Sequence, residues 1–387
     1  MKILSIETSC DDTALAILEV KELKAGQSFK ILGSAIQSQT EIHAQYGGVF
    51  PMMAKREHMK NIGPVYETVM KMAKNPKIDA VAVTVGPGLE PALWVGIVFA
   101  KELASKLKLP IIPVNHMEGH VLSIFPNKTK GFKVSNSKKD FPVLSLLVSG
   151  GHTELVLMKD WQKYKKIGVT RDDAAGEAYD KIARMMDLPY PGGISISNLA
   201  NQERTNNAPA SGNNFSGPRV SSFPTVTPPD HEKFSPEAFA PKLPRPMIHS
   251  KDYDFSFSGL KTSVLYLLRD MKSAGVEITD AIKAKIARES DEAIVEVLAA
   301  KTARAIKEYG VKTFTLGGGV SANKYLQECL EKAIKNIDKK IKIHYPTQGL
   351  STDNAIMIGI AGYFQYKKKK FLKKNFDSIK AQGNLSL

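Results

Sequence analysis

Two histidines at residues 116 and 120 are the strongest candidates for chemistry in this sequence, within the segment 115–120 (NHMEGH). They follow a strand-like apolar run at 110–114, and residues four apart share one face of a helix. His116 and His120 could therefore ligate one metal ion, although polar surface pairs without a metal have the same spacing. A carboxylate must complete such a site, and the best candidate is Asp353, at a predicted loop-to-helix junction in the other half of the chain.

The position of Glu118 argues against a metal-dependent protease. Such enzymes need a glutamate directly after the first histidine, where this chain has Met117. At about 100° per residue, the one-residue shift moves the carboxylate well round the helix. The protease interpretation is therefore weakened.

A glycine-rich segment at 316–323 (LGGGVSAN) follows a predicted strand and opens a predicted helix. Its glycines allow close backbone approach, and a helix N-terminus favours an anion. A tight turn with Ser321 or Asn323 as a helix cap would have the same sequence. The motif alone does not decide between these interpretations.

The segment from 172 to 193 offers further candidates. Residues 172–181 are rich in carboxylates, and Asp180 lies eight residues after Asp172, on roughly the same helical face. Gly193 ends the turn 190–193 (YPGG), where a ribose or base could lie against backbone. Solvated helix charges and a plain helix terminator explain these residues equally well.

An N-terminal strand–turn–strand pattern recurs later in the chain. Residues 3–15 align without a gap on residues 143–155, at an offset of 140, with identities at Ser5/Ser145, Ser9/Ser149, Thr13/Thr153 and Leu15/Leu155. Two hairpins with small or hydroxyl residues at their tips indicate a duplication with a ligand between the halves, since such tips can bind phosphate. Chance similarity between two buried hairpins is the alternative.

The elements that must position these motifs alternate between helix and strand, which predicts an α/β fold. Helical periodicity occurs at 57–72, 96–107, 279–309 and 321–335, and buried strands are expected at 81–85 and 312–316. We expect two subdomains, at 1–140 and 141–366. The second includes a surface insertion rich in Asn, Ser and Pro at 201–247, and a basic tail follows at 367–387.

Composition excludes several protein classes. A chain of 387 residues is too long to fold around one ordinary hydrophobic core. Its shares of 43% apolar and 24% charged residues are those of globular proteins and argue against a fibrous or disordered chain. Two cysteines exclude a disulfide scaffold and a cysteine-rich zinc module, which fits a reducing compartment. We find no signal peptide and no run of about 18 apolar residues, and so expect a cytoplasmic protein without a membrane partner.

A net charge of +15 predicts attraction to polyanions such as nucleic acid. Part of the excess is local, with lysine clusters at 128–139 and 367–374. A basic tail that binds nothing would give the same net charge.

Taken in order, these motifs resemble the family of transferases that form threonylcarbamoyladenosine in tRNA, closest to its bacterial and organellar branch, long called glycoprotease-like. The resemblance spans nearly the whole chain. It rests on the segments 6–11 (IETSCD), 47–49 (GGV), 86–88 (GPG), 116–120, 149–153 (SGGHT), 172–181, 255–262 (FSFSGLKT), 317–323 and 352–354 (TDN). So many matches in the same order make the resemblance specific.

The resemblance implies the duplicated actin-like fold of sugar kinases and heat-shock ATPases, with a cleft between two subdomains. It implies transfer of threonylcarbamoyl from threonylcarbamoyl-AMP to the adenosine beside the anticodon (position 37) of tRNAs reading codons that begin with A, releasing AMP. His116, His120 and Asp353 would hold one divalent metal ion per subunit, iron(II) or zinc. The adenylate would contact Leu147, Val148, Ser149, Gly150, Gly151, Asp180, Gly193 and Asn323.

For the proton acceptor we select Asp11, on the first hairpin tip. Members of the family depend on a separate enzyme for the adenylate. Bacterial members work with a paralogous partner subunit and a small ATPase, whereas organellar members act alone as homodimers. Asp12, Met52 and Ser197 depart from the family pattern, so roles at those positions do not transfer.

Two other functions share some of these features. A small-molecule kinase of the same fold superfamily would need the hairpins but not the two histidines. A non-catalytic partner subunit would tend to lose the metal ligands, all three of which are present here.

Overall fold

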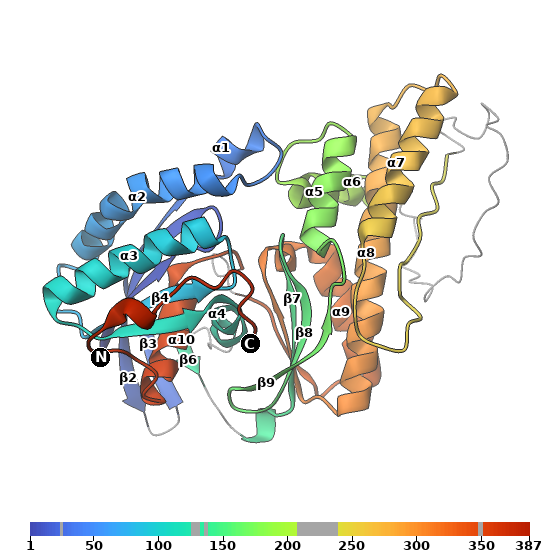
Figure 1. The fold of residues 1–387 in the computed structure, drawn as a ribbon. Coiled ribbons are helices and arrows are strands. Elements are labelled where there is room, and N and C mark those ends of the chain that lie inside the picture. Colours follow the sequence, from blue (N-terminus) through green and yellow to red (C-terminus); the bar gives the residue numbers. More distant parts are fainter. Residues whose placement is uncertain (24–25, 125–131, 135–137, 207–238, 347–350) are drawn as a thin grey trace.

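The computed structural model describes residues 1–23, 26–124, 132–134, 138–206, 239–346 and 351–387, which form two sheets flanked by helices (Figure 1). The first sheet has the order β5-β4-β1-β2-β3-β6. Its strands are β1 (Lys2–Glu7), β2 (Asp12–Leu23), β3 (Gly26–Ser38), β4 (Ala80–Gly86), β5 (Ile111–Asn115) and β6 (Phe132–Val134).

Side-chain alternation in β1 and β2 explains why both faces of the first sheet are covered. Leu4 and Ile6 face a core built with α2 (Pro51–Met72) and α3 (Glu90–Leu107). Ile3 faces the opposite core, built with α10 (Ala355–Lys367). The short helices α1 (Thr40–Ala44) and α4 (His116–Ser123) follow β3 and β5.

The second sheet has the order β11-β10-β7-β8-β9. Its strands are β7 (Val143–Val148), β8 (Thr153–Asp160), β9 (Lys163–Val169), β10 (Thr313–Gly317) and β11 (Lys342–His344). The helices of this half are α5 (Ala175–Met185), α6 (Gly192–Asn206), α7 (Ser258–Ser273), α8 (Asp280–Tyr309) and α9 (Lys324–Ile337). Short 3₁₀ turns lie at Lys138–Asp140, Gly319–Ala322 and Phe376–Ser378.

The two sheets confirm the duplication. In each half, the fifth, fourth, first, second and third strands lie side by side, and β6 is an addition at one edge. Ile3 pairs with Leu18 in the first hairpin, and Val143 pairs with Met158 in the second. Each residue of the first pair lies 140 positions before its counterpart in the second pair. The gap-free sequence alignment therefore matches residues that have the same pairing in the two hairpins.

The predicted subdomain limits remain a prediction, and two of the elements qualify them. Helix α10 lies within the predicted C-terminal subdomain at 141–366 but packs on the first sheet. The expected insertion at 201–247 falls mostly on residues outside the described ones. Its first residues, 201–206, belong instead to α6, and Phe239 and Leu243 are buried in the core of the second half.

The tail at 367–387 is only partly the basic surface segment that the sequence suggested. Its later residues fold back along β4 and β5, where Gln382 donates its backbone N–H to Val85 and Asn115 donates to the Ser386 carbonyl. Among the described residues, we find no helix with the length and apolarity needed to span a membrane.

Candidate metal and nucleotide site

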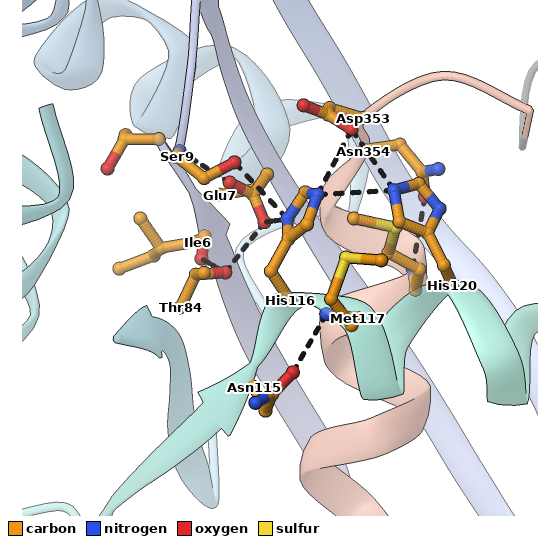
Figure 2. A network of polar contacts seen from close by, with 12 residues as sticks. Ile6, Glu7, Ser9, Thr84, Asn115, His116, Met117, His120, Asp353 and Asn354 are labelled. Atoms are coloured by element: carbon orange, nitrogen blue, oxygen red, sulfur yellow. Dashed lines mark hydrogen bonds and ion pairs between the residues drawn. The ribbon is translucent and has the colours of Figure 1, made fainter. Parts of the chain in front are cut away.

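His116, His120 and Asp353 meet at one point, as Figure 2 shows. The two Nε2 atoms lie 3.2 Å apart, and Asp353 Oδ1 lies 3.3 Å from His116 Nε2 and 3.2 Å from His120 Nε2. The histidines are nearly fully buried, with 6% and 2% of their surface exposed. Three ligand atoms of the predicted types thus converge within coordination reach of a common centre.

Two helix starts position these ligands. Asn115 caps α4 by accepting from the Met117 backbone N–H at 2.9 Å, which places His116 in the first turn. Asn354 caps α10 in the same way, with Met357 as donor at 3.0 Å, which fixes Asp353 directly before the cap residue. Gly119 lets the two helices approach closely, since a Cβ there would lie 3.1 Å from Met357 Cγ.

A buried carboxylate orients His116 from behind. Glu7 Oε2 lies 3.0 Å from His116 Nδ1 and accepts from the Thr84 hydroxyl at 2.7 Å (Figure 2). The Ser9 hydroxyl lies 3.2 Å from the same Nδ1. A carboxylate on the far nitrogen fixes the tautomer and makes the imidazole a better ligand, an arrangement typical of metal-bound histidine.

The electrostatics of this cluster favour a cation. Although burial works against the charged form, Asp353 and Glu7 raise the pKa of His116 to about 10. Burial also opposes ionisation of Asp353, but the two imidazoles hold its pKa well below the usual range. Two carboxylates thus stabilise positive charge at this buried point: a proton on His116 supplies that charge without metal, and a divalent cation that displaces the proton would supply it when bound. The residues therefore fit a metal ion.

Glu118 has a different role from the glutamate of a zinc protease. Its carboxylate accepts from Gln162 Nε2 and the Tyr164 hydroxyl, each at 3.0 Å, and from Gln365. None of these is a metal ligand, and the residue is 3% exposed. Glu118 thus anchors α4 to β9 and α10 and is not available as a base.

Beside the three candidate metal ligands lies a face of the second half lined with glycines. A Cβ on Gly150, Gly151 or Gly319 would meet no atom within 4 Å, so the backbone there borders open space. Gly318 is required for a different reason, because its φ is +86° and a Cβ would lie 2.4 Å from the Val148 carbonyl. The glycine-rich turn therefore lies directly against the second hairpin, which positions exposed backbone N–H groups for an anion.

Comparisons with known proteins agree with this geometry. A model of the family described as tRNA N6-adenosine threonylcarbamoyltransferase matches residues 30–360. The chain is 40% identical over 369 residues to the protein of that name from Chromobacterium violaceum, covering 95% of this chain and 94% of that one. It is 40% identical over 373 residues to the one from Persephonella marina, covering 95% and 91%.

The chain belongs to the tRNA N6-adenosine threonylcarbamoyltransferase family. It is therefore a transferase that modifies tRNA. Among solved structures it resembles full-length HypF in its phosphate- and nucleotide-bound form, with a TM-score of 0.50 and 12% identity. The match covers 94% of this chain and 55% of HypF, and this likeness shows the duplicated actin-like α/β fold alone.

Within this threonylcarbamoyltransferase, the residues expected at the adenylate lie on neighbouring elements. Leu147 and Val148 end β7, and Ser149, Gly150 and Gly151 form the turn to β8. Asp180 Oδ1 accepts from the Gly192 backbone N–H at 2.7 Å, which joins α5 to the start of α6 beside Gly193. Asn323 caps α9 by accepting from Leu326 N–H at 3.2 Å. Asp180 and Asn323 thus have structural bonds of their own.

Asp11 lies on the first tip, in the turn between β1 and β2. Burial and the nearby Asp353 carboxylate raise its pKa, although hydrogen bonding to Cys10 opposes the shift. Its charge in turn raises the pKa of Tyr190, after the larger effect of burial on that phenol. Asp11 is therefore within electrostatic range of both halves of the site.

The sequence patterns do not identify the residues that hold the candidate site residues in place. These are Glu7 and Thr84, which orient His116, and the buried Asp291, which accepts a hydrogen bond from Asn323. A glutamate within an otherwise apolar strand was a usable signal for Glu7. Asp291 gave no comparable signal, because it lies in a long helix with many charged residues.

Proposed function

We propose that this chain transfers the threonylcarbamoyl group from threonylcarbamoyl-AMP to the exocyclic amine of adenosine 37, in tRNAs that read codons beginning with A. The observation that supports this most is the position of the two-histidine, one-carboxylate cluster beside the glycine-lined tip of the second hairpin. A metal ion in the cluster could stabilise charge on the carbonyl oxygen of the substrate, and the backbone N–H groups of the glycine-lined tip could bind its phosphate.

The metal in this proposal is iron(II), with zinc as the alternative, since two imidazoles and a carboxylate suit both. A divalent ion bound there supplies Lewis-acid stabilisation for charge developing on the carbamoyl oxygen. Glu7 keeps the Nε2 of His116 directed at that position. No covalent enzyme intermediate is needed.

The remaining steps use the residues of the chain. Backbone N–H groups at Gly150 and Gly151, with Ser149, bind the phosphate, and Asp180, Gly193 and Asn323 border the nucleoside. The adenosine amine attacks the carbamoyl carbon, and the bond from that carbon to the phosphate oxygen breaks. AMP leaves with the bonding electrons, and Asp11 accepts the proton that the amine loses. Its raised pKa favours that role.

The partners are proposed from the family alone. A separate enzyme would supply the adenylate from threonine, bicarbonate and ATP. A paralogous subunit and a small ATPase would assist as in bacterial members, with an independent homodimer as the other arrangement. The net charge of +15 supports tRNA as the polyanionic substrate.

The test is direct. The purified chain is incubated with unmodified tRNA and threonylcarbamoyl-AMP, with and without the partner proteins, and nucleosides are analysed by mass spectrometry. We expect threonylcarbamoyladenosine that disappears with a chelator and is absent when adenosine 37 is replaced by guanosine. Transfer of the γ-phosphoryl group of ATP to a small-molecule acceptor with release of ADP, or no product with any partner set despite bound metal, would overturn the proposal.

A further inference from the structure

A buried carboxylate on α8, Asp291, has no part in the mechanism above and yet joins several elements of the nucleotide side. It is fully buried. Its Oδ1 accepts from the Tyr179 hydroxyl and from Asn323 Nδ2, each at 2.7 Å, and its Oδ2 accepts from Arg204 at 2.7 Å. Such a buried carboxylate is costly unless its hydrogen bonds are satisfied, and here three donors satisfy it.

These three donors come from the helices that border the proposed nucleotide. Tyr179 on α5 is adjacent in sequence to Asp180, and Arg204 lies on α6, the helix that begins at Gly192. Asn323 is the cap of α9. Asp291 is thus the one carboxylate among the described residues to which all three of these helices donate a hydrogen bond.

Arg204 is itself fixed. Its guanidinium lies 3.5 Å from the centre of the Tyr325 ring on α9, and it also donates to Asn201 at 2.9 Å. A stacked arginine paired with a buried carboxylate has little freedom to rotate. The Asp291 side chain is therefore held from one side by Arg204 while it binds Asn323 on the other.

The chemistry of this pair determines which end of the Asn323 amide faces outward. An ionised carboxylate only accepts hydrogen bonds, so the Asn323 amino group must face Asp291. Its oxygen accepts from Leu326 N–H and keeps a second lone pair. The amino group also lies 3.5 Å from the Tyr179 hydroxyl, so among the described contacts the second lone pair of the oxygen is the hydrogen-bonding position that this residue, 8% exposed, can offer to a ligand.

We infer that Asp291 is a positioning residue for the nucleotide: it orients Asn323 so that the side-chain oxygen accepts a hydrogen bond from the ligand, and it keeps α5, α6 and α9 aligned around it. This inference rests on the proposed function, because it assigns the glycine-lined face to the adenylate. The ligand donor is then the adenine amine or a ribose hydroxyl.

The test uses the metal-loaded protein and AMP as the probe, with affinity measured by calorimetry. We expect Asp291→Asn to weaken AMP about tenfold, the scale of one lost hydrogen bond, and to raise the KM for threonylcarbamoyl-AMP similarly. The kcat and metal content should remain within about twofold. Tyr179→Phe, which removes one hydroxyl only, serves as a milder second variant if Asp291→Asn folds poorly, with a loss of about threefold.

Glu292→Gln is the matched control. Glu292 is the next residue of α8 and lies 3.6 Å from Arg204 Nε, but it has no hydrogen bond to Tyr179 or Asn323 among the described contacts. We expect it to leave AMP affinity unchanged. Equal weakening by Glu292→Gln and Asp291→Asn would overturn the inference, because the effect would then come from Arg204 or from helix stability.

Analogues of AMP test the orientation of the amide itself. Wild-type protein should bind either inosine monophosphate, which lacks the amine, or 2′-deoxy-AMP more weakly than AMP, and Asp291→Asn should lose most of that discrimination. Unchanged discrimination would contradict the inference while leaving the proposed function intact. Failure of the wild-type protein to bind AMP at all would instead remove the nucleotide site and the inference together.

Discussion

The two hairpin tips of this protein have the same backbone pairing but different chemistry. At an offset of 140 residues, Glu7 aligns with Leu147, Asp11 with Gly151 and Asp12 with His152, in identical register. The first tip gathers carboxylates beside the metal ligands, whereas the second exposes glycine backbone. After a duplication, buried strands can thus preserve the same backbone pairing while their connecting turns diverge, here into a carboxylate-rich turn and a glycine-rich turn.

The contrast between Glu7 and Leu147 shows how a buried position can change chemistry. Leu147 is packed among apolar residues such as Met117 and Val121. Glu7 is equally buried but has His116, Thr84 and the Ser9 backbone as partners, and His116 lowers its pKa against the effect of burial. A carboxylate is tolerated in one hairpin because the other residues of the metal site neutralise it.

The largest expected effect concerns the metal side of this comparison. His116→Ala should remove the metal and lower transfer by at least about 10³-fold, since Lewis-acid stabilisation is worth several kcal/mol. Bound metal by elemental mass spectrometry and product formation check this, with circular dichroism for folding. His249→Ala, an exposed histidine, is the control. A metal-free His116→Ala protein with full activity would show that the two-histidine cluster is not the reaction centre.

A smaller loss of metal affinity or activity is expected from Glu7→Gln, which removes a carboxylate from the first hairpin and so makes it more like the second hairpin. The glutamine cannot offer the same acceptor to His116 Nδ1, so metal affinity or activity should fall about 10- to 100-fold. A metal titration measures the affinity, and an assay at saturating metal then measures the activity of the fully loaded protein, so the two effects are separated. Glu19→Gln, on the same hairpin but partly exposed, should have no effect. Unaltered metal affinity together with unaltered activity would leave Glu7 with a packing role only.

The duplicated hairpins and the two-histidine pair could be predicted from the sequence, because each depends on a pattern within a short segment. His116 and His120 were found from their spacing along one helix, and the hairpins from a pattern within single segments. Glu7 and Asp291 depend on partners 109 and 32 residues away, so their roles appear only when the chain is folded. Helix α10 is apolar and buried on nearly every side, so periodicity could not show which sheet it covers.

The second tip is tested by adding a side chain where backbone borders open space. Gly151→Val should raise the KM for threonylcarbamoyl-AMP about tenfold or more, because the new methyl groups would occupy the phosphate position. Metal content should not change, which separates this tip from the first. Gly63→Val is the control, since Gly63 on α2 also has nothing within 4 Å of a Cβ. Equal KM values for the two variants would place the phosphate elsewhere.

The smallest expected effect is on the pH dependence of stability, which should have opposite signs at the equivalent positions Asp12 and His152. Burial, then Asp11 and Asp353, raise the pKa of Asp12 to about 7, despite a hydrogen bond from Ser38. The folded state then binds a proton that the unfolded state has lost, so this residue makes stability fall as pH rises from about 4 to 7. Burial, then His116 and His120, lower the pKa of His152 to about 4. Here the unfolded state binds the extra proton, so stability rises between about pH 4 and 6.5.

Thermal unfolding of Asp12→Asn and His152→Gln between pH 4 and 8 tests this difference. Relative to wild type, Asp12→Asn should gain stability above pH 7 and gain little near pH 4. His152→Gln should gain near pH 4 and not above pH 7, because the histidine it replaces is already neutral there. The shifts should be about 2 °C for each kcal/mol in a chain of this size. Parallel profiles for both variants would mean that the two tips do not differ electrostatically, and the proposed division between a charged reaction centre and a neutral anion site would lose its basis.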